Sequence, residues 1–150
     1  MKLYLIQHGL ALAKEEDPER PLSTSGKTQT QRTVEFLKSK SINVDSIWHS
    51  TKLRAIQTAE IIAEALPCGK IQTREDMNPL DPVEKLAGEI LASNKNIMII
   101  GHLPFLQKLS GRLLTGSEES EIIAFKNSGV VSLDYDEKWK IDWLVSPEHL

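Results

Sequence analysis

The stretch Asn96-Ile97-Met98-Ile99-Ile100-Gly101 decides the fold, because its consecutive apolar residues leave no polar face along the backbone. A second stretch of the same character, Lys2-Leu3-Tyr4-Leu5-Ile6-Gln7, begins the sequence. Strands that are apolar on both faces are typical of a parallel sheet with helices on either side. Weaker strand candidates, Ser46 to Ser50 and Lys70 to Thr73, lie between the two. Together these stretches predict one mostly parallel sheet.

Helices are predicted in the gaps between these strands. The clearest runs from Asp81 to Ser93, with Asp81 expected as the N-cap and Pro82 at the first helical position. Its apolar residues recur at the spacing of one helix face: Val83, Leu86, Ala87, Ile90 and Leu91. Comparable patterns predict three further helices, over Ser25 to Lys40, Thr51 to Leu66 and Pro104 to Leu114.

The C-terminal part has a different pattern. Gly129 to Tyr135 and Lys138 to Leu144 alternate roughly between apolar and polar residues and flank Asp136-Glu137, which predicts an antiparallel hairpin at the sheet edge. Strands and helices that alternate along a chain form layers, with helices on both faces of the sheet. The expected fold is therefore a three-layer α/β/α sandwich, with a mostly parallel sheet and an antiparallel C-terminal edge hairpin, in a single domain spanning residues 1–150.

The composition excludes several classes of protein. Hydrophobic residues make up 40% of the chain and charged residues 26%, which are ordinary values for a globular domain. The net charge of -3 provides no basic field for nucleic acid. The apolar N-terminal stretch is too short for a membrane span or a signal peptide. Cys68 is the single cysteine and can form no internal disulfide, so we expect a cytoplasmic protein.

Polar residues follow three of the predicted strands. Gln7-His8-Gly9 follows the first, His49-Ser50 the second and Gly101-His102 the fourth. Because the carboxyl ends of parallel strands share one edge where ligands bind, we expect these groups around one crevice. The first and last of these histidines each adjoin a glycine that lets backbone or ligand come close, and they are the candidates for chemistry. His49 is more simply explained as a hydrogen-bonded structural residue.

Two arginines lie where they could bind an anion in that crevice. Arg54 is in the first turn of the helix that follows Ser50, and Arg20 precedes Pro21 and the next helix. A guanidinium group suits phosphate, since its donors match two phosphate oxygens at once. The alternative for each arginine is an ordinary exposed position on the surface.

Four segments, in this order, resemble the successive motifs of the histidine phosphatase superfamily, and the chain is most similar to its SixA-type phosphohistidine phosphatase branch. The segments are Leu5-Ile6-Gln7-His8-Gly9-Leu10-Ala11, Arg20-Pro21-Leu22-Ser23-Thr24-Ser25-Gly26, His49-Ser50-Thr51-Lys52-Leu53-Arg54-Ala55-Ile56-Gln57-Thr58-Ala59 and Ile99-Ile100-Gly101-His102-Leu103-Pro104. The resemblance covers most of the chain up to the C-terminal hairpin. It implies a fold like that of phosphoglycerate mutase.

The resemblance also implies roles for individual residues. His8 would be the nucleophile, Arg54 and Arg20 would bind phosphate, and His102 would contact the phosphoryl group. Gln7 and Gly9, on either side of the nucleophile, would complete the phosphate site. Neither a metal ion nor a cofactor is implied, and the partner would be a protein that carries phosphohistidine.

This chemistry is reasonable from first principles. A neutral imidazole attacks phosphorus well at cytosolic pH, and a phosphohistidine intermediate divides one difficult displacement into two easier ones. Donors around the phosphoryl oxygens then stabilise the transition state. A P–O substrate also needs a well-placed general acid, whereas the imidazole that leaves a phosphohistidine needs less help. Glu75 and Asp81 are the available acids, and Asp81 is already assigned to a helix cap, so the sequence favours a P–N substrate.

Gln7 departs from the superfamily pattern, which has arginine immediately before the nucleophilic histidine. Losing a charge-assisted hydrogen bond at the transition state would cost about 2 to 4 kcal/mol. A second hypothesis is therefore a weakened or inactive relative that binds phosphate or phosphoprotein. A third is a phosphatase of small phosphorylated metabolites. A metal hydrolase using His8, His49 and His102 is disfavoured, because no carboxylate lies at ligand spacing near them.

Overall fold

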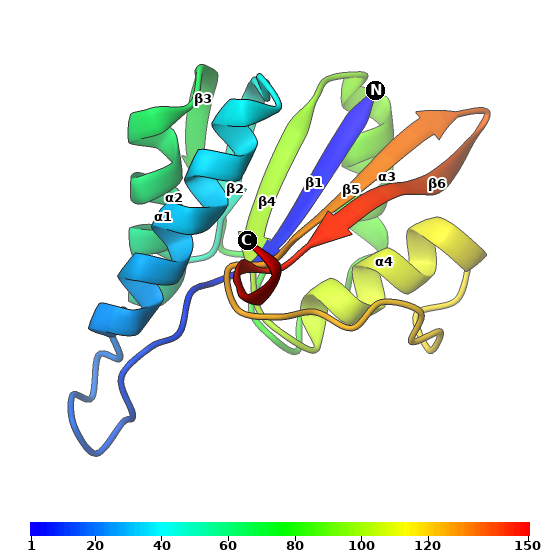
Figure 1. Ribbon diagram of the computed structural model, residues 1–150. Coiled ribbons are helices and arrows are strands. Elements are labelled where there is room, and N and C mark those ends of the chain that lie inside the picture. Colours follow the sequence, from blue (N-terminus) through cyan, green and yellow to red (C-terminus); the bar gives the residue numbers. More distant parts are fainter.

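The computed structural model describes residues 1–150 and contains one six-stranded sheet with strand order β3-β2-β4-β1-β5-β6 (Figure 1). The strands are β1 (Lys2–Gln7), β2 (Val44–His49), β3 (Cys68–Thr73), β4 (Ile97–Gly101), β5 (Val130–Asp136) and β6 (Lys138–Val145). The helices are α1 (Thr24–Ser39), α2 (Leu53–Ala65), α3 (Glu84–Ser93) and α4 (Phe105–Thr115), with a short 3₁₀ helix, η1 (Pro147–His149), near the C-terminus. The predicted strands, helices and edge hairpin are all present.

The four strands β3, β2, β4 and β1 pair in parallel, and β5 and β6 continue the sheet in antiparallel pairing. In the parallel register Gln7 pairs with Gly101, and His49 pairs with Ile100. The residues that follow β1, β2 and β4 consequently leave the sheet at the same edge. This is the arrangement that the sequence predicted for the mostly parallel α/β/α sandwich.

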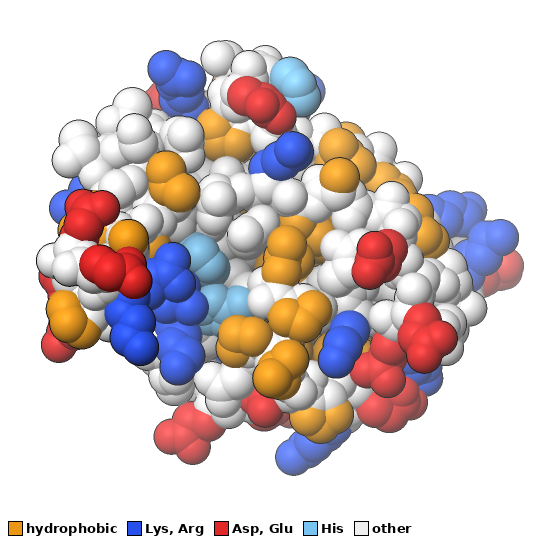
Figure 2. All heavy atoms as spheres, turned by 90° about the horizontal axis from the view of Figure 1, so that it is seen from below, with side chains coloured by type: hydrophobic (Ala, Val, Ile, Leu, Met, Phe, Trp, Pro, Cys, Tyr) orange, Lys and Arg blue, Asp and Glu red, His pale blue; other side chains and the backbone are white.

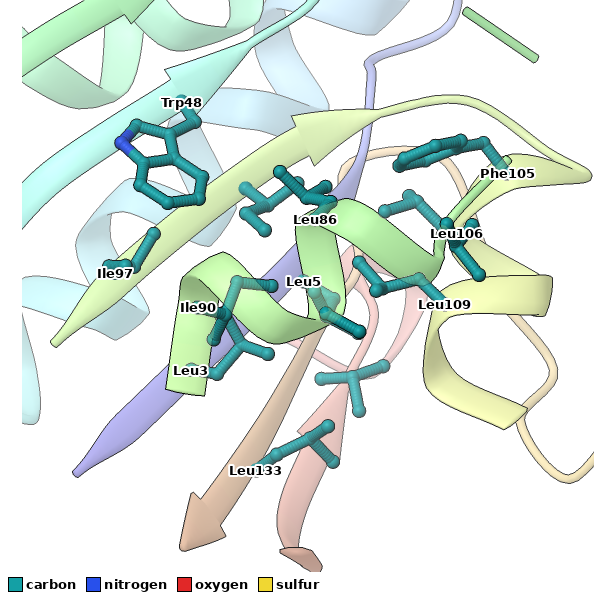
Figure 3. Close-up of a cluster of buried hydrophobic side chains, with 14 of the residues drawn as sticks. Leu3, Leu5, Trp48, Leu86, Ile90, Ile97, Phe105, Leu106, Leu109 and Leu133 are labelled. Atoms are coloured by element: carbon teal, nitrogen blue, oxygen red, sulfur yellow. The ribbon is translucent and has the colours of Figure 1, made fainter. Parts of the chain in front are cut away.

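The core consists of two layers, one on each face of the sheet. Successive side chains of a strand point to opposite faces, so Leu3 and Leu5 pack with α3 and α4, whereas Tyr4 and Ile6 pack with α1 and α2. Figure 3 shows part of the first layer, with Leu86 and Ile90 of α3 and the leucines of α4 against the strands. Both layers are tightly buried, which makes the end of the sheet a rigid support for the residues that follow it.

The start of α3 differs from the prediction. The helix begins at Glu84 rather than beside Asp81, and Val83 holds the N-cap position without a side-chain hydrogen bond. The Asp81 carboxylate instead accepts a hydrogen bond from the backbone N–H of Asn78 at 2.8 Å, so it closes a turn before the helix. Leu91 was expected on the buried stripe, but it is 43% exposed because the face that packs on the sheet is formed by other residues. None of the helices is both long enough and apolar enough to cross a membrane.

Candidate active site

His8 lies one residue beyond β1 and is held by the backbone on both sides. Its N–H donates to the Gly101 carbonyl at 3.0 Å, which extends the pairing of β1 with β4. Its own carbonyl accepts from the Asn127 side chain at 2.9 Å. The backbone of His8 is therefore fixed by the strand next to it and by the loop before β5.

The His8 ring has a defined orientation and tautomer. Nδ1 lies 2.7 Å from the Gly9 carbonyl oxygen. A carbonyl only accepts, so Nδ1 carries the hydrogen and Nε2 keeps a lone pair. An imidazole held in this way presents Nε2 as a nucleophile, and the carbonyl stabilises the positive charge that the ring gains when Nε2 forms a bond.

Gly9 supports this ring through its carbonyl oxygen. Its backbone N–H donates to the Thr58 hydroxyl at 2.9 Å. The role of Gly9 in binding phosphate stays a prediction. A Cβ at this position would lie 2.9 Å from both Leu22 and Thr30, which explains the glycine. The close approach that a glycine permits is used here by neighbouring side chains rather than by a ligand.

His102 faces His8 from the end of β4. The two ring centroids lie 5.0 Å apart, with an angle of 51° between the planes. His102 is buried, and its Nε2 lies 2.5 Å from the Ser50 hydroxyl oxygen. Its Nδ1 is buried without a hydrogen-bond partner. The structure thus brings together the two histidines that the sequence singled out.

Arg54 is the second residue of α2 and is half-buried beside the imidazoles. Its Nε is buried without a hydrogen-bond partner, like Nδ1 of His102. Buried donors of this kind are costly unless an acceptor completes them. Because an arginine donor is always charged, the acceptor that fits is an anion, and a phosphoryl group has enough oxygens for both.

Arg20 and Lys52 add positive charge to the same edge. Arg20 adopts a positive φ of 50°, and its Nε donates to the Leu12 carbonyl at 3.1 Å. This bond fixes the side chain in the loop before α1 and leaves other guanidinium donors for a ligand. Its charge acts on His8, and that of Lys52 acts on His102. Figure 2 shows a cluster of lysine and arginine side chains next to histidine atoms on this face of the molecule.

Both imidazoles are neutral at physiological pH. The pKa of His8 is lowered to about 4, chiefly by burial and also by the charges of Arg54 and Arg20, against the raising effect of the bond to the Gly9 carbonyl. The pKa of His102 is lowered to about 3, first by burial and then by the positive charges around it. The low pKa favours a neutral His102 over a protonated one.

The remaining candidates have other contacts in the structure. The His49 ring lies 2.9 Å from the Ser50 carbonyl oxygen through Nδ1, and this buried contact fits the structural role expected for it. Gln7 is half-buried, and its carbonyl accepts from the Ser128 N–H at 2.9 Å, while its side-chain amide has no hydrogen bond within the chain. The carboxylates considered as acids do not act on either imidazole, whose charged neighbours are all basic. No three His, Cys, Asp or Glu side chains are grouped closely enough to hold a metal ion.

The sequence reasoning missed several residues that hold the site. Ser50 was noted only as part of a strand end, and it contacts His102. Thr58 accepts from Gly9 and donates to the Arg54 carbonyl at 2.7 Å, which ties α2 to the His8 loop. The spacing of one helical turn between Arg54 and Thr58 was a signal for the second contact. Nothing near Asn127 in the sequence indicated that it would reach His8.

The parallel sheet edge with its two facing histidines and nearby arginines is the arrangement expected of a protein that binds a phosphoryl group. Residues 3–82 match the family model of the histidine phosphatase superfamily (branch 1), and the chain belongs to this superfamily. It is 27% identical to the phosphohistidine phosphatase SixA of Escherichia coli strain K12, in an alignment covering 100% of this chain and 96% of the relative.

Solved structures give the same result. The structure of a protein histidine phosphatase SixA complexed with tungstate superposes with a TM-score of 0.88 at 25% identity, covering 99% of each chain. The α-ribazole phosphatase of Shigella flexneri superposes with a TM-score of 0.72 at 19% identity, covering 98% of this chain and 97% of that one. The second likeness shows the fold alone. The chain is therefore a SixA-type member of the superfamily with the fold of phosphoglycerate mutase-like proteins.

Proposed function

We propose that this protein hydrolyses phosphohistidine on a protein substrate through a phosphorylated His8 intermediate. The observation that carries the proposal is the His8 ring, neutral and anchored through Nδ1 at 2.7 Å from the Gly9 carbonyl oxygen, with Nε2 left to attack. Arg54 and His102 supply the buried donors beside it. The likeness to SixA supports the same activity.

The reaction has two transfers. Nε2 of His8 forms a bond to phosphorus while the bond from phosphorus to the substrate imidazole breaks, and the electron pair of that bond stays on the leaving nitrogen. The positive ring of phospho-His8 is stabilised through Nδ1–H and the Gly9 carbonyl. Water then attacks phosphorus while the bond from phosphorus to Nε2 breaks. The electron pair of that bond returns to the ring, the hydrogens of the water leave with the phosphate, and His8 is again neutral with its hydrogen on Nδ1. Arg54, with Arg20 and Gln7 at the edge of the site, would bind the phosphoryl oxygens.

The surroundings of the site favour a P–N bond in a macromolecule. The charged groups that shift the pKa values of the two imidazoles are basic and include no carboxylate, which favours a leaving group that needs little help from a general acid. Figure 2 shows pale-blue histidine atoms between a cluster of lysine and arginine side chains and a group of exposed apolar side chains. Leu103 and Ile122 are 39% and 51% exposed and belong to a groove between the start of α4 and residues 121–125. An apolar rim of this kind suits a protein surface better than a small polar metabolite.

Two further features complete the proposal. The positive charge that stabilises the transition state comes from arginines, so hydrolysis is expected to need no metal ion and to persist in a chelator. Cys68 is a free thiol, which supports a reducing compartment such as the cytoplasm.

The test is turnover of a phosphohistidine protein by the wild type, His8→Ala and Gln7→Arg, measured side by side with sugar and nucleotide phosphates. We expect the wild type to turn over phosphohistidine and His8→Ala to show no turnover. Because glutamine lacks the charge of an arginine, Gln7→Arg should raise the rate of an already active protein by roughly 30-fold or more. A silent wild type that gains on the order of 100-fold or more from Gln7→Arg would instead identify a degenerate binding protein. Preference for a sugar or nucleotide phosphate would overturn the substrate class.

A further inference from the structure

The Ser50 side chain contacts the ring of His102. It follows β2, it is fully buried, and its hydroxyl oxygen lies 2.5 Å from Nε2 of His102. The same oxygen accepts a hydrogen bond from the Lys52 backbone N–H at 3.3 Å. These two contacts are the complete set of partners of the hydroxyl.

The direction of the bond between Ser50 and His102 follows from counting hydrogens. If Nε2–H donated to the hydroxyl, the oxygen would accept twice and its own hydrogen would be buried without an acceptor. Leaving a buried hydroxyl donor unsatisfied costs about 1 to 3 kcal/mol. If the hydroxyl donates to Nε2, both contacts of the Ser50 hydroxyl are satisfied, and the unpaired hydrogen lies on Nδ1 of His102 instead. A phosphoryl oxygen bound beside His8 can accept that hydrogen, whereas the buried serine hydrogen of the first arrangement would stay unpaired with or without a ligand, so the second arrangement is favoured.

This direction determines the tautomer of His102. An Nε2 that accepts has no hydrogen, so the neutral ring carries its hydrogen on Nδ1. Nδ1 is the atom that is buried without a partner within the chain, on a ring whose centroid lies 5.0 Å from that of His8. A donor without a partner so near the nucleophile is available to an oxygen of the group under attack. The opposite tautomer would place a lone pair there, which repels a phosphoryl oxygen.

We propose that Ser50 is a positioning residue, which fixes His102 in the Nδ1–H tautomer so that a neutral imidazole donates a hydrogen bond to the phosphoryl group. Its part in catalysis rests on the proposed function, whereas the tautomer itself is a property of the resting protein. The fixed direction also explains how His102 donates without being protonated.

The test begins with the tautomer in the unmodified protein. Long-range ¹H–¹⁵N correlation spectra at pH 7.5 distinguish a ring hydrogen on Nδ1 from one on Nε2, and a His102→Gln variant assigns the signal. We expect the Nδ1–H pattern in the wild type and in Ser50→Thr, which keeps the hydroxyl. In Ser50→Ala we expect a mixture of tautomers. An Nε2–H pattern in the wild type would overturn the inference without any variant.

A second readout measures the consequence. Ser50→Ala should lower kcat on phosphohistidine by about 10- to 100-fold with a smaller change in KM, and Ser50→Thr should restore most of the rate. Ser132→Ala is the matched control, because Ser132 is also a fully buried serine and its hydroxyl has no partner. An unchanged kcat in a folded Ser50→Ala variant would refute the positioning role.

The failure of the proposed function would be recognised separately. Tungstate binding, measured by calorimetry, depends on the hydrogen-bond donor on Nδ1 of His102 but does not depend on catalytic turnover. If the wild type hydrolyses no phosphohistidine, weaker tungstate binding by Ser50→Ala than by Ser132→Ala would still support the tautomer. Equal binding by all three proteins would contradict it.

Discussion

Acidification should leave His8 and His102 neutral far below the pH at which an ordinary histidine is protonated. An imidazole with an unperturbed pKa of about 6.5 is only about 9% neutral at pH 5.5. His8, whose pKa burial lowers to about 4, would be about 97% neutral at that pH. Its nucleophilic form therefore persists across the whole physiological range.

The lowered pKa values also make the stability of the protein depend on pH. Both folded-state pKa values, about 4 for His8 and about 3 for His102, lie below that of an unfolded histidine, so the unfolded chain binds more protons in between. The contribution to stability is complete above pH 6.5 and is lost as the pH falls toward 4. The differences between the unfolded and folded pKa values correspond to roughly 3 kcal/mol for His8 and roughly 5 kcal/mol for His102, and the two contributions are coupled because the rings are close together.

The assay is a titration of the histidine ¹³Cε1 chemical shifts between pH 3 and 8, with His8→Ala and His102→Gln to assign the signals. Urea unfolding curves of the same proteins at pH 7.5 and 5.5 measure the stability. We expect two midpoints well below 5, and a smaller loss of stability on acidification in His8→Ala than in the wild type. A His8 midpoint between 6 and 7 would refute the argument from burial.

Three further substitutions test particular contacts. Arg54→Lys keeps the charge but loses the planar fork, so tungstate affinity measured by calorimetry should fall by 10-fold or more, and unchanged affinity would remove Arg54 from the site. The Arg74 side chain pairs with two carboxylates, and its guanidinium carbon lies 4.5 Å from the centroid of the Trp48 ring. Arg74→Ala should therefore lower the free energy of unfolding, measured in urea, by about 1 to 3 kcal/mol. A change below about 0.5 kcal/mol would show that these contacts are not stabilising. Gly26→Ala should destabilise the chain and lower its thermal midpoint, because a Cβ there would overlap the Leu10 carbonyl, and an unchanged midpoint would mean that the loop before α1 adjusts freely.

The strands and most of the site could be predicted from the sequence, because both depend on local patterns. Apolar runs identified β1 and β4 to within one residue, and the shared edge of a parallel sheet brought His8 and His102 together. The predicted start of α3 was wrong because the sequence identifies a capping residue by its type alone. The Asp81 carboxylate accepts a hydrogen bond from the Asn78 N–H within its own turn and does not cap the helix. Capping signals that lie in a turn are ambiguous until the turn itself is known.

The supporting contacts could not be predicted, because they join residues far apart in the chain. The hydroxyl of Ser50 contacts a ring 52 positions later, and Asn127 reaches a carbonyl 119 positions earlier. Gly9 was expected to admit a ligand, whereas its amide and its Cα are occupied by Thr58, Leu22 and Thr30. Whether a side chain or a ligand lies against a glycine depends on the tertiary packing, which the local sequence does not indicate.

The role of His8 as the nucleophile is tested most directly by trapping the phosphoryl group on the protein. The protein is mixed with a radiolabelled phosphohistidine substrate, quenched in alkali and digested, and the labelled peptide is sequenced by mass spectrometry. We expect a label on Nε2 of His8 that is stable in base and lost in acid, and none in His8→Ala. A label that persists in His8→Ala, or that is found on another residue of the wild type, would contradict the proposed mechanism.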